Sequence, residues 1–456
     1  MPSQYFMQIY LHPGIRATGW RECAPMPASP RFRPLLLASS LLALAVPALH
    51  AAAPASLDER IILVPAAGTD KEDRDITQWQ GRIKVAAASD AALPGAYERL
   101  GWAYMAKARR TLDAGYYKLA EKTADAMDAR FGPTNEALLL RGSVDHNLHR
   151  FADAEAVARQ LVARRGLAFD YALLSDALME QGKLAESVQA CQKMMALKPG
   201  VDAYSRAANL RWLTGDLPGA ITAMEAAVRA GSPLDATNTA WTLSRLSAYY
   251  LQAGRSHDAL QVAQSAARLV PEYPPALLAQ GRAYLAMGQT ALAARQIAVA
   301  ARLNPLPEYQ WWLADTLRIA GDPAGALRVE AELAARGEAA DPRTYSLFLA
   351  TRRELPAEAR RLATAELGNR ADVFTQDALA WSLAASGDLA GADTAIQAAL
   401  AARTQDARLF LHAGEIALGR GQPAAARGYF AQAEKYAFTL TPSERALLDS
   451  RLPRSS

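Results

Sequence analysis

The apolar residues between positions 168 and 199 fall into two stripes, each with the spacing of one face of a helix. Members of a stripe lie three or four positions apart: Tyr171, Leu174 and Leu178 in the first, and Ala185, Val188, Cys191 and Met194 in the second. This period predicts two amphipathic helices. Gly182 lies between the stripes and Pro199 follows the second, so we expect an antiparallel helix pair with a tight turn at the glycine.

The same plan recurs along the chain with a nearly constant period. The turn glycines are Gly182, Gly215, Gly254, Gly288, Gly321, Gly387 and Gly421, with gaps of 33, 39, 34, 33, 66 and 34 residues. The longest gap spans two periods and has Glu354 where a glycine is expected, so that unit lacks the turn residue of the others. The gap of 39 holds extra residues near 231–239, which we expect in a loop. A unit of this length buries its apolar face against its neighbours, and the repeat therefore predicts a solenoid.

Small and large residues at fixed offsets around these glycines resemble the tetratricopeptide repeat (TPR) family. The clearest units are built on Gly182, Gly254 and Gly288; the last of these contains Leu277, Gly281, Tyr284, Ala293, Ile297, Ala300 and Pro305 at the family's offsets. The resemblance covers about residues 94–440. It implies an all-α fold, an α-solenoid in which about ten antiparallel helix pairs form a right-handed superhelix.

The two ends of the repeat region carry further expected elements. Residues 54–93 read as an N-terminal linker followed by a first helix from Ile76 to Ala87. Residues 441–456 read as a C-terminal capping helix and tail, with Thr441 or Ser443 as the N-cap residue.

Residues 26–53 have the order of regions found in a secretory signal peptide. Arg31 and Arg33 precede an apolar run from Leu35 to Leu49, and the small residues Ala51–Ala53 follow it. Serines and a proline interrupt the run, so we expect no stable membrane span in the mature chain. The sequence therefore predicts an exported protein of the periplasm or cell envelope. An uncleaved N-terminal anchor helix is the alternative.

Met26 is the expected start of translation, which makes residues 1–25 an extension of the gene model. Removal of residues 1–53 takes away four of the 50 basic residues and one of the 46 acidic residues, and leaves a charge of 46 minus 45, or +1. A near-neutral chain with interspersed signs argues against a nucleic-acid partner. Two cysteines cannot form a disulfide framework.

In the TPR family the first helix of each pair lines a concave surface, and this implies a set of groove residues. The positions that match the family's groove positions hold Trp212, Trp241, Arg282, Trp311, Asp315, Arg318, Phe348, Arg352, Phe374, Asp377 and Trp381. Aromatic and arginine side chains are enriched at recognition surfaces, so we expect a solvent-facing aromatic trough with a polar rim. Within it, Trp311, Asp315 and Arg318 are our hypothesis for a peptide anchor. The alternative is that these rings pack between neighbouring repeats.

The resemblance implies a non-catalytic scaffold of the bacterial cell envelope that binds a protein or peptide on its concave surface and needs no cofactor. A chaperone-type carboxylate clamp is not expected, because Asn209 fits one clamp position but Asp176 and Ser205 occupy others. A second hypothesis is a carbohydrate-binding or glycosyltransferase-associated accessory protein, since tryptophan-lined troughs also stack sugars.

No catalytic motif is found in the sequence. Ser256, His257 and Asp258 are consecutive, so their side chains diverge instead of forming a triad. His146 and His149 are three positions apart, but no further metal ligand lies near them, and we expect no metal site. His412 is interpreted as a structural histidine. An enzyme whose site these patterns miss is the third hypothesis.

Overall fold

The computed structural model describes residues 57–452 except 88 and 112, so the expected signal peptide and gene-model extension lie outside the described residues. All regular secondary structure in this part of the chain is helical, which confirms the predicted all-α class. Helices α2 (Leu57–Ile62) and α3 (Lys71–Val85) come first. Ten helix pairs follow: α4 (Leu93–Thr111) and α5 (Gly115–Phe131), α6 (Asn135–Asn147) and α7 (Phe151–Arg164), α8 (Ala168–Glu180) and α9 (Leu184–Leu197), α10 (Val201–Leu213) and α11 (Leu217–Arg229), α12 (Ala236–Gln252) and α13 (Ser256–Leu269), α14 (Pro274–Ala286) and α15 (Thr290–Leu303), α16 (Pro307–Ile319) and α17 (Pro323–Ala340), α18 (Pro342–Arg352) and α19 (Pro356–Asn369), α20 (Val373–Ala385) and α21 (Leu389–Leu400), and α22 (Ala407–Gly419) and α23 (Pro423–Lys435). A 3-10 turn, η2 (Ala437–Thr439), and the capping helix α24 (Pro442–Asp449) end the fold.

The turns at the seven periodic glycines are left-handed, as the sequence predicts. All seven periodic glycines have φ between 71° and 88°. In the unit without a glycine, Arg353 takes the left-handed position with φ 56°, and Pro356 starts the second helix two residues after Glu354. Leu355 is left-handed as well, with φ 44°, so the helix junction is kept at the cost of two strained non-glycine residues.

Two predicted boundaries are wrong. The extra residues near 231–239 do not form a plain loop: they form the 3-10 turn η1 (Pro233–Asp235) and lengthen α12 to 17 residues. Asp235 caps this longer helix by accepting a hydrogen bond from the Asn238 amide. Helix α3 begins before the expected Ile76, because Asp70 forms a capping box with Asp73 ahead of the first apolar residue. The N-cap at Thr441 is confirmed.

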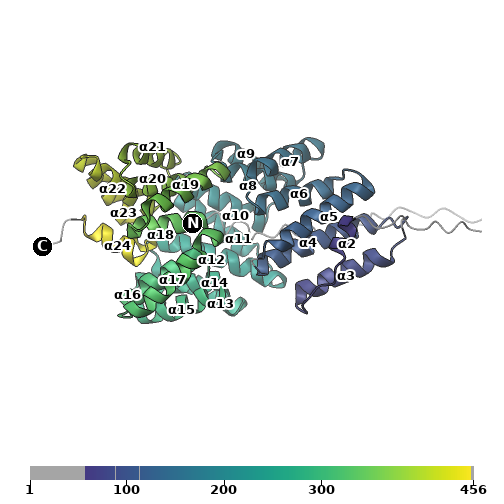
Figure 1. Ribbon diagram of the computed structural model, residues 1–456, viewed down its shortest axis with the longest axis horizontal. Helices are drawn as coiled ribbons and strands as arrows, with labels where there is room; N and C mark the ends of the chain where they lie inside the picture. Colours follow the sequence, from purple (N-terminus) through teal and green to yellow (C-terminus); the bar gives the residue numbers. More distant parts are fainter. Residues whose placement is uncertain (1–56, 88, 112, 453–456) are drawn as a thin grey trace, which may run out of the picture.

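The C-terminal repeats lie against the middle repeats, so the coil of stacked helix pairs closes on itself. Figure 1 shows α2 to α7 extending toward one end, while α18 to α24 lie beside α10 to α16 at the other. The Thr404 hydroxyl donates a hydrogen bond of 2.6 Å to the Leu213 carbonyl, 191 residues away. The Gln252 side chain donates to the Gln405 carbonyl, and the Ser443 amide donates to Asp315 over 3.0 Å. The contacts lie on the first helices of the middle repeats, at Leu213, Gln252 and Asp315. This surface, here called the inner face, is therefore in contact with the C-terminal repeats.

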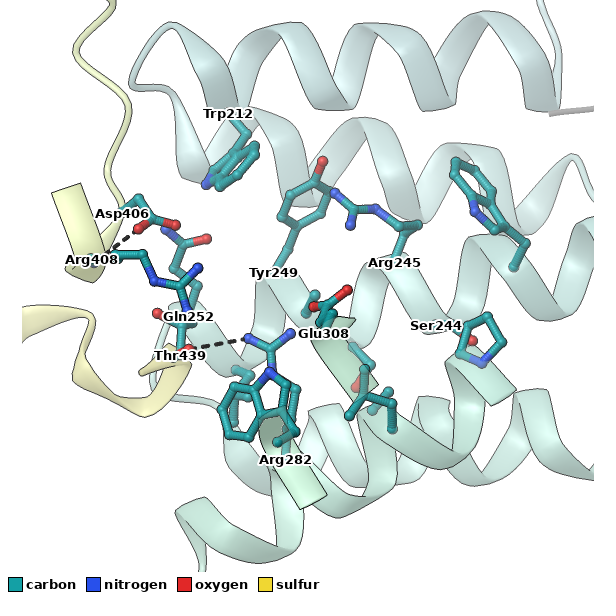
Figure 2. Close-up of a pocket in the computed structure, with 18 residues that line it drawn as sticks. Trp212, Ser244, Arg245, Tyr249, Gln252, Arg282, Glu308, Asp406, Arg408 and Thr439 are labelled. Carbon is teal, nitrogen blue, oxygen red and sulfur yellow. Dashed lines mark hydrogen bonds between the residues drawn. The ribbon is translucent and has the colours of Figure 1, made fainter. Parts of the chain in front are cut away.

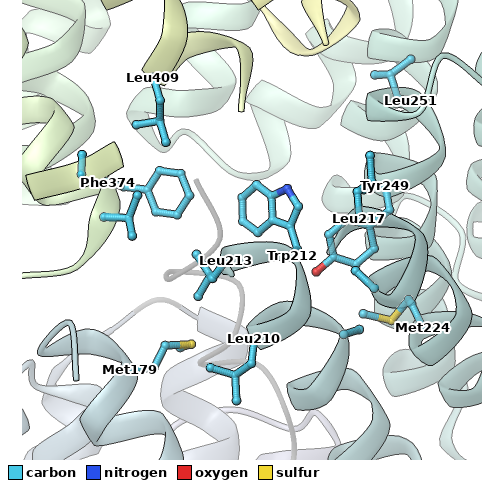
Figure 3. Packing of buried hydrophobic residues seen from close by; sticks show 14 of the residues in the cluster. Met179, Leu210, Trp212, Leu213, Leu217, Met224, Tyr249, Leu251, Phe374 and Leu409 are labelled. Atoms are coloured by element: carbon cyan, nitrogen blue, oxygen red, sulfur yellow. The ribbon is translucent and has the colours of Figure 1, made fainter. Parts of the chain in front are cut away.

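One apolar core joins these two parts of the chain. It combines residues of α8 to α14 with residues of α20 to α22. At its centre the rings of Trp212 and Phe374 stack with centroids 5.5 Å apart, and Leu213 and Leu409 lie beside them (Figure 3). Two constraints favour glycine at position 215. Its φ is 88°, and, because the chain closes here, an added Cβ would lie 2.7 Å from the Arg403 carbonyl oxygen.

Buried charges lie at the same junction. Arg370 is paired with Glu180 of α8 over 3.7 Å, and Arg343 is paired with Asp372 over 2.9 Å. Burial raises the pKa of Glu180 to about 7, against the opposing effect of Arg370. The contact between α8 and the segment that precedes α20 therefore contains a carboxyl group that titrates near neutral pH.

Candidate functional site

The predicted groove residues lie on the first helices of their pairs, but the expected solvent-facing trough is wrong. None of the six aromatic side chains is more than 7% exposed: Trp212, Trp241, Trp311, Phe348, Phe374 and Trp381 are all buried. The physical reason is the closure of the coil, which covers one part of the inner face with the C-terminal repeats and packs other parts between neighbouring repeats. The Trp311 and Phe348 rings, for example, meet edge to face at 5.8 Å.

The predicted polar groove residues are also engaged by the chain itself. Asp315 accepts hydrogen bonds from Ser443 at the start of α24. Arg318 and Arg352 both pair with Glu330 on α17. The hypothesised anchor of Trp311, Asp315 and Arg318 is therefore not brought together around an open space.

Asp377 pairs with a histidine instead of facing a partner. Its carboxylate lies 2.8 Å from His412 Nδ1, and the imidazole stacks on Trp381 at 4.2 Å. Both side chains of the pair are 1% exposed. A buried, stacked histidine beside a carboxylate fits the structural interpretation of His412.

The other two histidines of interest pack around Phe151. The rings of His146 and His149 lie 5.3 Å and 5.5 Å from the Phe151 ring. Burial lowers the pKa of both imidazoles, that of His149 to about 3. Within the part of the chain that the structure describes, no group of three or more histidine, cysteine or acidic residues is placed to hold a metal ion.

A deep pocket is found where the inner face is not sealed. It lies between α12, α14 and the first two turns of α16, and its other walls are Trp212 of α10 and the segments around Asp406 and Thr439 (Figure 2). It leaves about 100 Å³ to the centres of water-sized molecules. At about 10–15 Å³ for each water this is room for about seven to ten waters, comparable to a small organic ligand. Of the predicted groove residues, the pocket brings together Trp212, Trp241 and Arg282.

Charged side chains of both signs line this pocket. Figure 2 shows Arg245, Arg282, Glu308 and Arg408 around the same space. Arg408 is neutralised by an ion pair with the fully buried Glu444, and this arginine lowers the pKa of Glu444 although burial opposes the shift. Arg282 is different: burial lowers its pKa even though Glu308 favours the charged form.

Aromatic rings hold the two arginines of α12 and α14 in place. The Arg245 guanidinium lies 5.4 Å from the Tyr249 ring centre, and that of Arg282 lies 4.9 Å from the Trp312 ring centre. Arg282 also donates to the Thr439 carbonyl over 3.5 Å. The two cations are thus preorganised toward the pocket.

Sequence reasoning missed most residues of this pocket. Arg245 follows Trp241 by four positions, so it lies on the same helix face, and this signal could have been used. Glu308 and Trp312 lie on one face of α16. Trp312 directly follows the predicted groove residue Trp311 in the sequence. Asp406 lies between repeats, and no periodic signal could have found it.

An apolar groove lies on another part of the surface, between α9, α10 and α11. It leaves about 630 Å³ to the centres of water-sized molecules. Its walls include the partly exposed Val188, Met195, Tyr204, Ala207 and Ala223. Its exposed polar lining is Gln192, Arg211, Thr214, Thr222 and Arg229. The groove thus has an apolar floor and a polar rim that includes two arginines.

The described helices include none that is both long enough and apolar enough to cross a bilayer.

Comparisons with known proteins identify repeats in the chain. The family profile described as tetratricopeptide repeat matches residues 139–202 and 278–342, which lie within the ten helix pairs. No curated protein matches the chain.

Several solved structures are similar to the chain at low sequence identity. The APC/C hetero-tetramer Cut9–Hcn1 is 13% identical, with a TM-score of 0.34 over 84% of this chain and 97% of that chain. A complex of human IFIT1 with PPP-AAAA is 12% identical, with a TM-score of 0.43 over 81% of this chain and 96% of that chain. MamA is 17% identical, with a TM-score of 0.30 over 36% of this chain and 94% of that chain.

Proposed function

The chain is a tetratricopeptide repeat protein, and we propose that it is a non-catalytic scaffold that binds a protein partner through the groove between α9, α10 and α11. The observation that carries the proposal is the composition of this groove, which has an apolar floor and an exposed polar rim. Protein interfaces share this anatomy, with tyrosine, methionine and arginine enriched. A helix with one apolar face is the partner element that such a groove fits.

The inner face supports a protein partner less well than this groove. Its aromatic residues are buried, and Asp315, Gln252 and Arg282 already bind main-chain or side-chain atoms of the C-terminal segments. A partner on that face would have to displace part of the chain itself. The groove between α9 and α11 requires no such rearrangement, which lowers the cost of binding.

Substitutions inside the groove test the proposal. Met195→Glu and Ala223→Glu each place a charge on the apolar floor, and we expect each to abolish capture of the partner from a cell-envelope extract, as read by mass spectrometry. Leu327→Glu on α17 is the matched control, because Leu327 is 62% exposed and lies outside the groove. Circular dichroism checks that the variants keep their helices. If both groove variants capture the same proteins as the unsubstituted chain, the groove is not the binding surface.

We further propose that the mature chain works in the periplasm or cell envelope. The support is the order of charged, apolar and small residues from Arg31 to Ala53. Cell fractionation of the organism, with mass spectrometry of the mature N-terminus, tests this. A cytoplasmic chain that begins with the uncleaved segment would contradict the proposal.

The carbohydrate-binding hypothesis is not favoured. Sugar stacking requires exposed tryptophan faces, and Trp212, Trp241, Trp311 and Trp381 are at most 6% exposed.

A further inference from the structure

Three charged side chains that line the pocket of the inner face form no ion pair with one another. Arg245, Arg282 and Glu308 all line it, and Glu308 is only 9% exposed. Among the described residues, neither guanidinium has a carboxylate oxygen within 4.0 Å, and Glu308 accepts no hydrogen bond. Charges removed from water are costly unless they are paired or hydrogen-bonded. Arg245 and Arg282 are partly buried and Glu308 is nearly buried, so contents that satisfy both signs would lower this cost.

Individual atoms support the same conclusion. The Nε atoms of Arg245 and Arg282, together with Nε1 of Trp212, are buried and have no hydrogen-bond partner within the described chain. All three are donors, and they belong to three different helices. An acceptor such as a carboxylate would satisfy the arginine donors, because the guanidinium geometry matches two carboxylate oxygens.

The remaining charged groups of the pocket already have partners. Arg408 pairs with Glu444, and the Asp406 carboxylate accepts a 2.9 Å hydrogen bond from the Arg408 amide. The groups left for a ligand are therefore two cations and one anion. The walls between them are mixed: Ser244, Ser247 and Gln252 are polar, and the partly exposed Ala248 and Ala279 are apolar.

We propose that this pocket binds a small zwitterion, a molecule that carries a carboxylate and an ammonium group a few bonds apart, of which a free α-amino acid with an apolar side chain is the simplest. Arg245 and Arg282 bind the carboxylate, Glu308 binds the ammonium group, and the partly exposed Ala248 and Ala279 contact the side chain. A short peptide with free termini carries the same chemistry and is the other source of such a ligand. The proposed site lies on a different surface from the partner groove and does not depend on the scaffold function.

Calorimetric titration of the full chain with four probes tests the proposal. L-Leucine carries both charges, N-acetyl-L-leucine keeps only the carboxylate, L-leucinamide keeps only the ammonium group, and the dipeptide Leu-Leu carries both charges farther apart. We expect leucine or the dipeptide to bind, and each singly charged analogue to bind about tenfold or more weakly than leucine or the dipeptide. Tighter binding of the dipeptide would support the proposal with a peptide as the source. Binding of N-acetyl-leucine as tight as that of leucine would mean a simple anion site and overturn the proposal, as would no binding of either zwitterion.

Three variants assign the charges to residues. Glu308→Gln should weaken the binding of the zwitterion about tenfold and leave the binding of N-acetyl-leucine unchanged, whereas Arg282→Gln and Arg245→Gln should weaken both. Arg302→Gln on α15 is the matched control, since Arg302 is exposed and lies outside the pocket. The ratio of the two affinities within one variant does not depend on the fraction that is folded. An equal loss of both ligands in Glu308→Gln would show that Glu308 does not bind the ammonium group, and would overturn the assignment.

Discussion

Two stretches of the inner face, one on α10 and one on α12, each carry a predicted groove tryptophan but lie in different environments. Around Leu213 the C-terminal repeats seal the surface, and Phe374 stacks on the neighbouring Trp212 indole in the apolar core. Between α12 and α14 the same repeats leave a pocket lined by Arg245, Arg282 and Glu308. The repeat period determines which residues face inward. What then covers them depends on how the C-terminal repeats close over them.

Removal of the Phe374 ring from the sealed part of the inner face should have the largest effect on stability. Phe374→Ala removes a buried ring between the two parts of the chain, and we expect the free energy of unfolding to fall by about 3–5 kcal/mol. Phe438→Ala, at a ring that is 45% exposed, should cost much less. Urea denaturation of both variants measures the difference. Equal losses would mean that Phe374 is not sealed by the contact.

The turn glycines sharpen the comparison, because two of them share a backbone conformation but not a neighbourhood. An added Cβ at Gly215 meets the Arg403 carbonyl oxygen at 2.7 Å, whereas nothing lies within 4 Å of one at Gly288. We expect Gly288→Ala to cost about 1 kcal/mol from the left-handed φ, and Gly215→Ala to cost about 2–4 kcal/mol because the clash adds to it. Thermal unfolding of the pair provides the test. If the two variants have the same stability, Gly215 is not in contact with Arg403.

Glu180 should make the closed contact sensitive to pH. Its folded pKa of about 7 lies above its ordinary value of 4.5, so the folded state holds the proton more tightly. This carboxyl group therefore stabilises the fold most below about pH 4.5, and its contribution is lost as the pH rises to about 7. We expect a contribution of about 1–3 kcal/mol.

Other charged and titratable groups also act on the stability of the fold, so the contribution of Glu180 must be measured as a difference between two chains. Arg370, Arg343, Asp372 and Asp176 act on it, while the lowered pKa of His149 stabilises the fold in the opposite direction, as the pH rises toward about 6.5. The change in unfolding free energy between pH 5 and pH 8 should therefore be compared in the wild-type chain and in Glu180→Gln. If both show the same pH dependence, Glu180 does not titrate in this range.

The smallest effect is expected where the capping helix attaches. Ser443→Ala removes the hydroxyl that donates to the buried Asp315, and should cost about 1–2 kcal/mol. Hydrogen exchange should show faster opening of α24 without a change in α4 to α7. Ser450→Ala, at the end of the same helix, is the control. Unchanged protection of α24 would mean that the bond does not hold the helix in place.

The fold could be predicted from the sequence, because every turn glycine and apolar stripe repeats a local requirement. Gly254 and Gly288 have the expected left-handed φ, and Thr441 caps the last helix. The candidate site could not be predicted in the same way. Trp311 is on the predicted face, but whether solvent or Ser443 lies opposite that face depends on contacts more than one hundred residues apart in sequence. A periodic pattern contains no information on such contacts.

The distance between the turn at Thr214 and the segment at Arg403 tests the closed coil most directly. Both residues are exposed, and Thr214→Cys with Arg403→Cys, in a chain whose Cys23 and Cys191 are replaced by alanine, allows two spin labels to be attached. We predict a single short distance by pulsed electron resonance, because Thr404 bonds to the Leu213 carbonyl. A distance of about 50 Å or more, as expected for six repeats stacked without closure at about 8–10 Å a layer, would contradict the account.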